Sequence, residues 1–343
     1  MSNQSIVTEF LLLEFSDIWE LQILYFAAFF IIYLTSLTGN LLVTIVVAFN
    51  HSLHTPMYFF LVNLSMVDLG YISVTIPKAI TNSLLATWQI SYSECLAQVF
   101  FFIFFVSSEI YLLTVMAYDR YVAICNPLQY EQLMNKTACI RMVASVWIVS
   151  LFNAALHTTC TFAITFCSNV INQFFCEIPQ LLQISCSKSY DLEDGAVLFS
   201  TLFAVACFAF IIISYLQIFK AVQRIPSLQG RKKAISTCLP HLLVLFLFYF
   251  TGCTAFLGPI FTSSGERGLV LTVMYITIPP SMNPIIYSIR NKEILTGVWR
   301  LLGKSKFCNF MYKLGVSAFF FKKRRNKQKR PTFPKAFSIQ ITV

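Results

Sequence analysis

Four charged side chains lie within or at the edge of long apolar stretches, where a charge must be held or used by something. Asp68 and Glu109 each fall inside an apolar run, and an Asp119-Arg120-Tyr121 triplet closes the run that begins near Cys95. Burying a charge in hydrocarbon is unfavourable unless the charge is paired or hydrated. The triplet therefore indicates a functional hinge, although an isolated Arg would more often extend its stem to the lipid head groups.

Asp68 and Glu109 are the carboxyl groups placed deepest in apolar sequence, and both should point inward. Two inward carboxyl groups on adjacent helices, with no buried Lys or Arg within reach along the sequence, favour a shared proton or a bound cation. Asn40 and Asn283 lie in other apolar runs and supply amide partners. The alternative is a hydrogen-bonded packing network in which Glu109 is protonated.

Two other classes of membrane protein have little support in the sequence. An intramembrane enzyme is disfavoured because the four histidines, at positions 51, 54, 157 and 241, form no HExxH motif, and no inward Ser has a credible base. A transporter or channel would show an internal repeat and charges strung along a pathway. Asp68 and Glu109 instead form a single cluster, and no repeat is visible.

The composition indicates an integral membrane protein. Of 343 residues, 57% are hydrophobic and only 12% are charged, whereas soluble chains carry about twice that charged fraction. No removable signal peptide is evident, so the first apolar run is expected to direct insertion. The formal charge is +10, but 14 of the 25 Lys and Arg residues lie from Arg290 onward. The basic excess therefore belongs to one tail and predicts no nucleic-acid partner.

Seven apolar runs are long enough to cross a bilayer, which takes about 20 residues of helix. Because backbone polar groups in lipid must be satisfied within each segment, the runs should be helices rather than strands. The expected fold is an all-α bundle of seven transmembrane helices. The predicted spans cover residues 23–49, 57–80, 95–121, 142–166, 196–219, 234–260 and 269–289.

The distribution of basic residues predicts the orientation of the bundle. One side carries 22 Lys and Arg residues and the other only Lys78, Lys188 and Arg267. By the positive-inside rule, the N-terminal segment 1–22 is extracellular and the C-terminus is cytoplasmic. Asn3, in Asn3-Gln4-Ser5, is then on the correct side for N-glycosylation.

Two segments follow the seventh span. Residues 290–303 mix Ile, Leu, Val and Trp with Lys and Arg, which predicts a short amphipathic helix on the membrane surface. In the basic tail, 304–343, the stretch KKRRNKQKR at 322–330 follows three Phe residues. Attachment to anionic lipid and a solvated, disordered charge run are equally compatible with this stretch.

Five of the eleven cysteines lie in or near the predicted outer side, where disulfides can form. They are Cys95, Cys160, Cys167, Cys176 and Cys186. A bond from Cys95 to the second outer loop would tie that loop over the mouth of the bundle, but the residues alone leave the pairing open. Zinc binding is disfavoured because no CxxC pair is present.

Several motifs, in the right order, resemble the odorant branch of the rhodopsin-like G-protein-coupled receptors. The resemblance covers approximately residues 8–302. It is carried by PMYFFLVNLSMVDL at 56–69, MAYDRYVAICNPLQY at 116–130, KKAISTCLPH at 232–241 and NPIIY at 283–287. Two departures are Ile235, where the family has Phe, and Phe250, where it commonly has Gly.

This resemblance implies a receptor in the plasma membrane, not an enzyme. It would bind a small hydrophobic volatile in the outer half of the bundle and activate a stimulatory, olfactory-type heterotrimeric G protein that raises cyclic AMP. The implied ligand set is apolar and aromatic with a hydroxyl or two, although each aromatic alone could simply pack against its neighbours. Its members are Phe102, Ile103, Val106, Ser107, Phe199, Phe203, Tyr249, Cys253 and Phe256.

The resemblance also implies a switch, two disulfides and an ion site. The disulfides are Cys95 with Cys176 and Cys167 with Cys186, and no cofactor is expected apart from a sodium ion at Asp68 and Glu109. Pro279, Pro280 and Pro284 should kink the seventh helix, which would help it hold two arrangements. The switch and G-protein coupling set is Asp119, Arg120, Tyr121, Tyr215, His241, Asn283, Pro284 and Tyr287.

Overall fold

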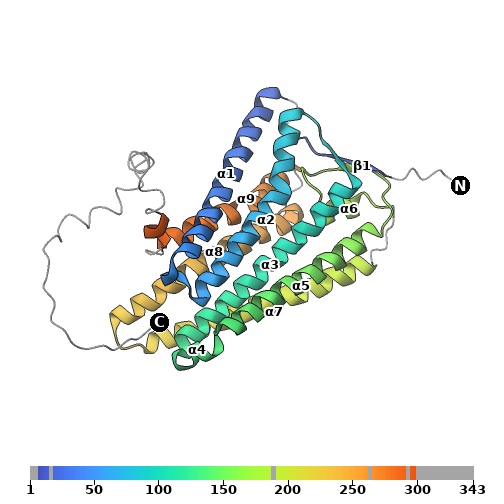
Figure 1. The fold of residues 1–343 in the computed structure, drawn as a ribbon. Coiled ribbons are helices and arrows are strands. Elements are labelled where there is room, and N and C mark those ends of the chain that lie inside the picture. The colour runs from blue at the N-terminus through green and yellow to red at the C-terminus, as the bar shows by residue number, and fades with distance from the viewer. Residues whose placement is uncertain (1–6, 15–17, 187–190, 262–264, 291–293, 299–343) are drawn as a thin grey trace.

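The computed structural model describes residues 7–14, 18–186, 191–261, 265–290 and 294–298. Seven of its helices are long and apolar enough to cross a membrane, which confirms the predicted number of spans (Figure 1). Each helix contains most or all of one predicted span. The seven are α1 (Trp19–Phe49), α2 (Pro56–Leu85), α3 (Tyr92–Cys125), α5 (Lys136–Phe162), α7 (Asp191–Arg224), α8 (Leu228–Phe261) and α9 (Gly265–Arg290).

Local capping explains why some helices start earlier than hydropathy predicts. At the start of α3, the Ser91 hydroxyl accepts a hydrogen bond from the Glu94 amide, and the Glu94 carboxylate accepts one from the Ser91 amide. This capping box satisfies two amides that the helix leaves unpaired. Asn135 caps α5 through its side chain alone, accepting from the Ala138 amide at 2.9 Å.

The end of α5 differs from the prediction. The helix stops at Phe162 rather than at residue 166, and the chain turns there. Phe166 then packs against Phe10 with a ring-centroid distance of 5.4 Å. The apolar residues after Phe162 are therefore used to build the end of the molecule rather than to extend the span.

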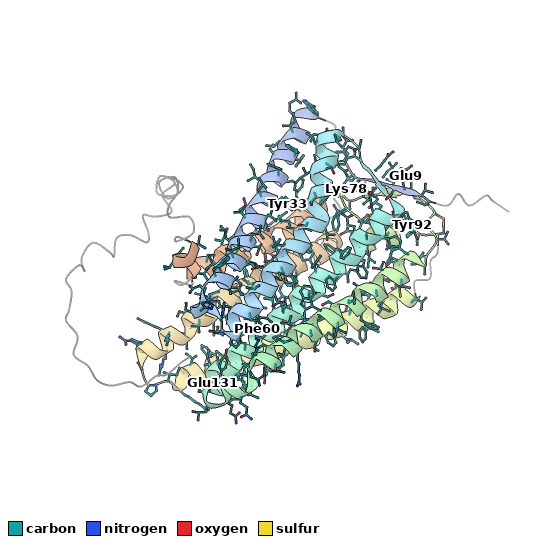
Figure 2. All side chains as sticks on the ribbon, viewed as in Figure 1. Glu9, Tyr33, Phe60, Lys78, Tyr92 and Glu131 are labelled. Carbon is teal, nitrogen blue, oxygen red and sulfur yellow. A yellow bond between two sulfur atoms is a disulfide. The ribbon has the colours of Figure 1, made fainter. Side chains whose placement is uncertain are left out.

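Helix α3 lies at the centre of the bundle and packs against α2, α5, α7 and α8, while α9 packs against α1, α2 and α8. Phe60 of α2 is fully buried in this core (Figure 2). At the α1–α9 contact, a Cβ added to Gly39 would lie only 2.8 Å from Pro284 Cγ. This contact therefore needs the absence of a side chain at position 39.

One end of the bundle, here called the disulfide end, is closed by a small sheet that the sequence did not predict. Strand β1 (Glu9–Leu12) pairs antiparallel with β2 (Gln89–Ser91) and parallel with β3 (Val170–Ile171). Phe10 and Ile171 are fully buried beneath it. A short helix, α6 (Ile178–Gln183), lies beside the sheet (Figure 1).

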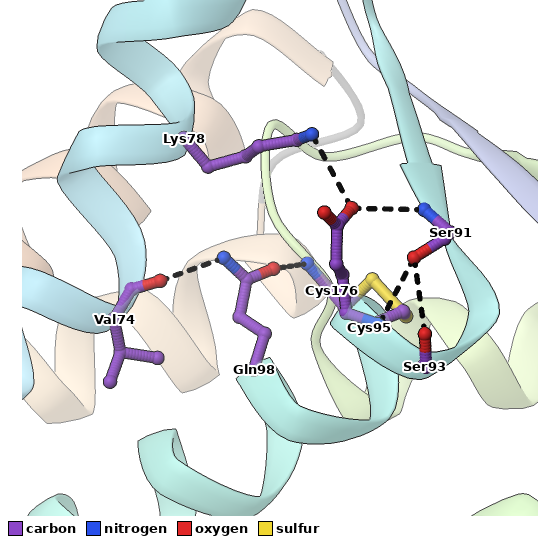
Figure 3. Close-up of a disulfide and its surroundings, with 8 residues drawn as sticks. Val74, Lys78, Ser91, Ser93, Cys95, Gln98 and Cys176 are labelled. Carbon is purple, nitrogen blue, oxygen red and sulfur yellow. Dashed lines mark hydrogen bonds and ion pairs between the residues drawn. A yellow bond between two sulfur atoms is a disulfide. The ribbon is translucent and has the colours of Figure 1, made fainter.

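Both disulfides at this end join the pairs that the family resemblance implies. Cys95 at the start of α3 is bonded to Cys176, and Cys167 is bonded to Cys186. The first bond ties the loop between α5 and α7 to the central helix. Gln98 reinforces the tie, because its side chain donates to the Val74 carbonyl at 3.0 Å and accepts from the Cys176 amide at 2.8 Å (Figure 3).

The opposite end, here called the Arg120 end, carries short helical turns. After α3 come a 3-10 turn (Pro127–Gln129) and α4 (Tyr130–Leu133). Residues 294–298, part of the predicted surface helix 290–303, are helical, and Ile294 is buried in the same apolar cluster as Val46 of α1. The rest of that helix beyond α9, the basic tail and Asn3 lie outside the described residues.

Candidate functional site

The triplet at the end of α3 is held in one arrangement by three side chains. Arg120 donates to Asp119 Oδ2 through its Nε, at 2.9 Å, and through its Nη2. The Tyr130 hydroxyl donates to the other oxygen, Oδ1, at 2.8 Å. Asp119 is fully buried, so its charge is balanced by Arg120 rather than by water.

Of the other predicted switch residues, Tyr215 and His241 bond to each other, whereas Asn283 and Pro284 lie at other contacts of α9. The Tyr215 hydroxyl of α7 lies 2.6 Å from His241 Nδ1 of α8, so this histidine joins α8 to α7. Tyr121 packs in a small cluster with Tyr215 and Cys238. Tyr287 of α9 is buried, and its hydroxyl has no hydrogen-bond partner among the described residues.

In the middle of the bundle, one amide group joins the two buried carboxyl groups. Asn283 Nδ2 lies 3.1 Å from both oxygens of Asp68 and 3.4 Å from Glu109 Oε1. Both carboxyl groups are fully buried. Helices α2, α3 and α9 therefore meet at a single polar cluster, as the sequence predicts for two inward carboxyl groups.

Three buried side-chain oxygen atoms on α1, α3 and α9 lack a hydrogen-bond partner among the described residues. Asn40 Oδ1, Glu109 Oε2 and Asn283 Oδ1 are buried and accept no hydrogen bond from any described group. Unsatisfied carboxyl and amide oxygens are the ligands that hard cations prefer. No group of three or more His, Cys, Asp and Glu side chains with metal-ligand geometry occurs in the described part of the chain.

The prolines of α9 are accommodated by polar side chains of α1. Helix α9 continues through Pro279, Pro280 and Pro284. Because Pro284 has no amide hydrogen, the Pro280 carbonyl one turn earlier lacks its helical donor. The Ser36 hydroxyl and Asn40 Nδ2 each donate to this carbonyl at 2.9 Å. The bonds from α1 thus replace the one that α9 loses.

The predicted ligand residues of α3 face two different sides of the bundle. The ring of Phe102 contacts Tyr71, Phe175 and Tyr275, between α2, α9 and the loop. Val106 packs against the same cluster, whereas Ile103 packs against the cluster around the Cys95–Cys176 disulfide. Ser107 is buried and faces α5.

The predicted ligand residues of α7 and α8 are more open. The ring of Phe203 meets Tyr111 of α3 edge-on at 5.3 Å and stacks on Phe199. Tyr249 contacts Phe208 at 4.8 Å, and its buried hydroxyl has no partner among the described residues. Cys253 is exposed on α8, and the side chain of Phe256 lies outside the described residues.

A row of polar residues between α5 and α7 was not predicted as part of any site. Asn153 and His157 lie one turn apart on α5 and contact Ser200 and Glu193 of α7. Asn153 also donates to Ser107 at 2.8 Å. The spacing of two polar residues four apart in an apolar helix was the signal available in the sequence.

Glu177 is a partly buried carboxyl group in the loop at the disulfide end. Glu177, next to Cys176, accepts a hydrogen bond of 3.5 Å from Gln173, which also donates to Thr272 of α9. Burial raises the pKa of Glu177 to about 7, and the Gln173 hydrogen bond opposes that rise. By contrast, Glu94 forms an exposed ion pair with Lys78 at 3.5 Å, which joins α3 to α2 (Figure 3).

Comparisons with known proteins agree with the geometry. The family model described as olfactory receptor matches residues 29–305. Human (Homo sapiens) olfactory receptor 14I1 is 50% identical over 308 residues, which are 90% of this chain and 99% of that protein. Human olfactory receptor 14C36 is 46% identical over 303 residues, 88% of this chain and 97% of that protein.

Among solved structures, squid rhodopsin has the same fold. It matches with a TM-score of 0.67 at 18% identity, over 84% of this chain and 87% of its own. The seven helices, the Asp119-Arg120-Tyr121 triplet near the end of α3 and the polar cluster at the centre agree with the family match over most of the chain. The protein is therefore a member of the olfactory receptor family, within the rhodopsin-like G-protein-coupled receptors.

Proposed function

We propose that this receptor binds a small, mostly hydrophobic volatile in the half of the bundle nearer the disulfide end. The observation that carries the proposal is the composition of the predicted ligand set, which is aromatic and apolar, has hydroxyl groups at Ser107 and Tyr249, and has no charged member. Such a set suits an uncharged ligand with at most one hydrogen-bonding group. Two members, Ser107 of α3 and Phe203 of α7, lie where α3 meets α5 and α7, because Ser107 bonds to Asn153 of α5 and Phe203 packs against Tyr111 of α3.

The signal would reach the Arg120 end through a change in helix packing. In the arrangement described here, Asp119 holds Arg120, and Tyr215 holds His241. A ligand that binds a second arrangement more tightly shifts the receptor toward it, by no more than the difference in affinity. We expect α8 to move away from Arg120 in that state and to open a cleft for a stimulatory, olfactory-type G protein that raises cyclic AMP.

The proposed orientation places the disulfide end outside the cell. The basic side chains that begin or end helices at the Arg120 end support it, because basic residues concentrate on the cytoplasmic side. They include Lys136, Arg141, Lys220, Arg224 and Arg231. The two disulfides support it as well, since they form in oxidising compartments. Asn3 would then be extracellular and open to glycosylation.

We also propose a sodium ion at the central polar cluster. Asp68 and Glu109 would supply carboxylate oxygens, and Asn40 and Asn283 amide oxygens that accept no hydrogen bond from the described groups. The bound ion would balance the buried negative charge. The alternative is that no ion binds, Glu109 carries a proton and the cluster is a hydrogen-bonded packing network.

A cyclic AMP reporter in cells that express the full chain tests the proposed function against a panel of volatiles. Arg120→Ala should abolish the response at normal surface expression, and a full response would refute the switch. Phe203→Ala should change the ranking of ligands rather than silence all of them. Phe219→Ala is the matched control, because Phe219 lies on the same helix and is 60% exposed. A ranking unchanged by Phe203→Ala would remove that residue from the ligand site.

A further inference from the structure

Four hydrogen bonds link a buried carboxyl group near the disulfide end to Ser107. Glu193 Oε1 lies 2.7 Å from His157 Nδ1, and His157 Nε2 lies 2.8 Å from Ser200 Oγ. Ser200 donates to Asn153 Oδ1 at 2.6 Å, and Asn153 Nδ2 donates to Ser107 Oγ at 2.8 Å. The five residues alternate between α7 and α5 and end on α3.

The chain of bonds has a fixed direction. A hydroxyl group has one proton, and Ser200 uses its proton on Asn153 Oδ1. The contact between Ser200 and His157 therefore requires a proton on His157 Nε2. Every later donor in the chain points toward α3, so Ser107 receives a hydrogen bond from Asn153 and does not give one to it.

The buried position of Glu193 favours this direction over the reverse one. The reverse direction would turn the Asn153 amide, place the only proton of His157 on Nδ1 and leave Glu193 ionised beside a neutral imidazole. Glu193 and His157 are 1% and 7% exposed, so an unbalanced charge there is strongly disfavoured. In the direction described, the pair has no net charge, either as imidazolium with carboxylate or as imidazole with carboxylic acid.

Ser107 is consequently left with a proton to donate. Its oxygen accepts the hydrogen bond from Asn153, and its hydroxyl hydrogen has no acceptor among the described residues. One turn further along α3, Tyr111 packs against Phe203 of α7. The free donor thus lies on the same side of α3 as the aromatic rings of the proposed ligand site.

We propose that Glu193, His157, Ser200 and Asn153 are positioning residues that fix Ser107 as a hydrogen-bond donor, so that the receptor selects volatiles with an acceptor oxygen, such as ketones. This inference rests on the proposed ligand site and names the class of ligand that the site takes. Ligands that can only accept a hydrogen bond match Ser107, whereas pure hydrocarbons of the same shape leave its proton unused.

The test compares ketones with hydrocarbons of the same shape on the purified full-length receptor. The probes are cyclohexanone with methylenecyclohexane and acetophenone with alpha-methylstyrene, pairs in which a methylene group replaces the carbonyl oxygen. The rise in melting temperature gives the half-saturating concentration of each probe. The quantity compared is the ketone-to-hydrocarbon affinity ratio, which one net hydrogen bond from Ser107 should make about 2- to 10-fold higher in the wild type than in Ser107→Ala.

Variants separate positioning from packing. Ser107→Ala should therefore lower this ratio about 2- to 10-fold, and Ser107→Thr should keep it, because threonine retains the donor. Asn153→Asp conserves volume but only accepts hydrogen bonds, so it should capture the Ser107 proton and lower the ratio as Ser107→Ala does. A merely structural role for Asn153 predicts no change in the ratio.

The outcomes are distinct. An affinity ratio that is the same in the wild type and in Ser107→Ala overturns this inference and leaves the proposed odorant site intact. If none of the four probes changes the melting temperature, the proposed ligand site fails together with the inference. If Asn153→Asp does not fold, Ser107→Ala and Ser107→Thr decide the matter alone.

Discussion

The Tyr130 hydroxyl donates a hydrogen bond to the same carboxylate that holds Arg120. It reaches Asp119 Oδ1 at 2.8 Å, while Arg120 takes Oδ2. Burial and the nearby Asp119 carboxylate raise the pKa of Tyr130, so its hydroxyl remains a donor at neutral pH. The segment after α3 therefore stabilises the arrangement in which Asp119 holds Arg120, and Tyr130 was not among the predicted switch residues.

Removing this hydroxyl should raise signalling in the absence of ligand. A hydrogen bond to a charged group contributes about 1.5–3 kcal/mol, so Tyr130→Phe should increase basal cyclic AMP several-fold at matched surface expression. Tyr118→Phe is the control, because Tyr118 lies on α3 and packs against Phe210. Basal cyclic AMP equal to wild type would mean that Tyr130 does not restrain the switch.

A methyl group at the α1–α9 contact should destabilise the bundle. The Cβ of Gly39→Ala would lie 2.8 Å from Pro284 Cγ, which belongs to a rigid ring. Overpacking of this kind costs about 1–3 kcal/mol, so the melting temperature of the purified receptor should fall. Gly195→Ala meets no atom within 4 Å and should leave it unchanged or slightly higher. Equal melting temperatures for the two variants would contradict the close packing.

Sodium should stabilise the receptor through Asp68 and Glu109. The wild type should melt at a higher temperature in sodium chloride than in the same concentration of N-methylglucamine chloride. Sodium at 100 times its dissociation constant should raise the free energy of unfolding by about 2.7 kcal/mol. Glu109→Gln and Asp68→Asn should remove the difference, and Glu131→Gln, a change on the exposed α4, should keep it. A wild type that melts identically in both salts rules out the ion and leaves the packing network.

The Glu177 carboxyl group should make stability fall as the pH rises. Its pKa is raised from 4.5 to about 7 by burial, so the folded receptor binds a proton there that the unfolded chain releases at lower pH. The stabilisation is fully present below about pH 4.5 and is lost as the pH rises through 7. In melting curves from pH 4.5 to 8, Glu177→Gln should decline less than the wild type and than Glu9→Gln, a change at an exposed position. If melting temperature depended on pH in the same way for all three proteins, the Glu177 carboxyl group would be exposed to solvent in the folded receptor.

Hydropathy alone predicted the seven helices, because each needs only a local run of apolar residues. Hydropathy did not predict where the helices begin, because Ser91 and Asn135 cap α3 and α5 before the apolar runs start. The closing sheet could not be predicted: strands of two to four residues carry no periodic signal, and Leu11 pairs with Val170 far along the chain.

The same distinction applies to the site. Asp68 and Glu109 were predictable because a carboxyl group in an apolar run is conspicuous, and the structure joins them through Asn283. His157 and Glu193 were visible as single residues, but their contact depends on how α5 faces α7. That arrangement is a property of the packed bundle and not of either segment.

Strand β1 is synthesised well before its parallel partner, β3. It leaves the ribosome before its parallel neighbour β3, which lies beyond the fourth membrane helix, α5. At about 5–20 residues per second, the delay is on the order of 10 s. Until then, the buried faces of Phe10 and Leu12 are exposed, so an N-terminal fusion that masks them would interfere with the last step of closing this end rather than with insertion of the helices.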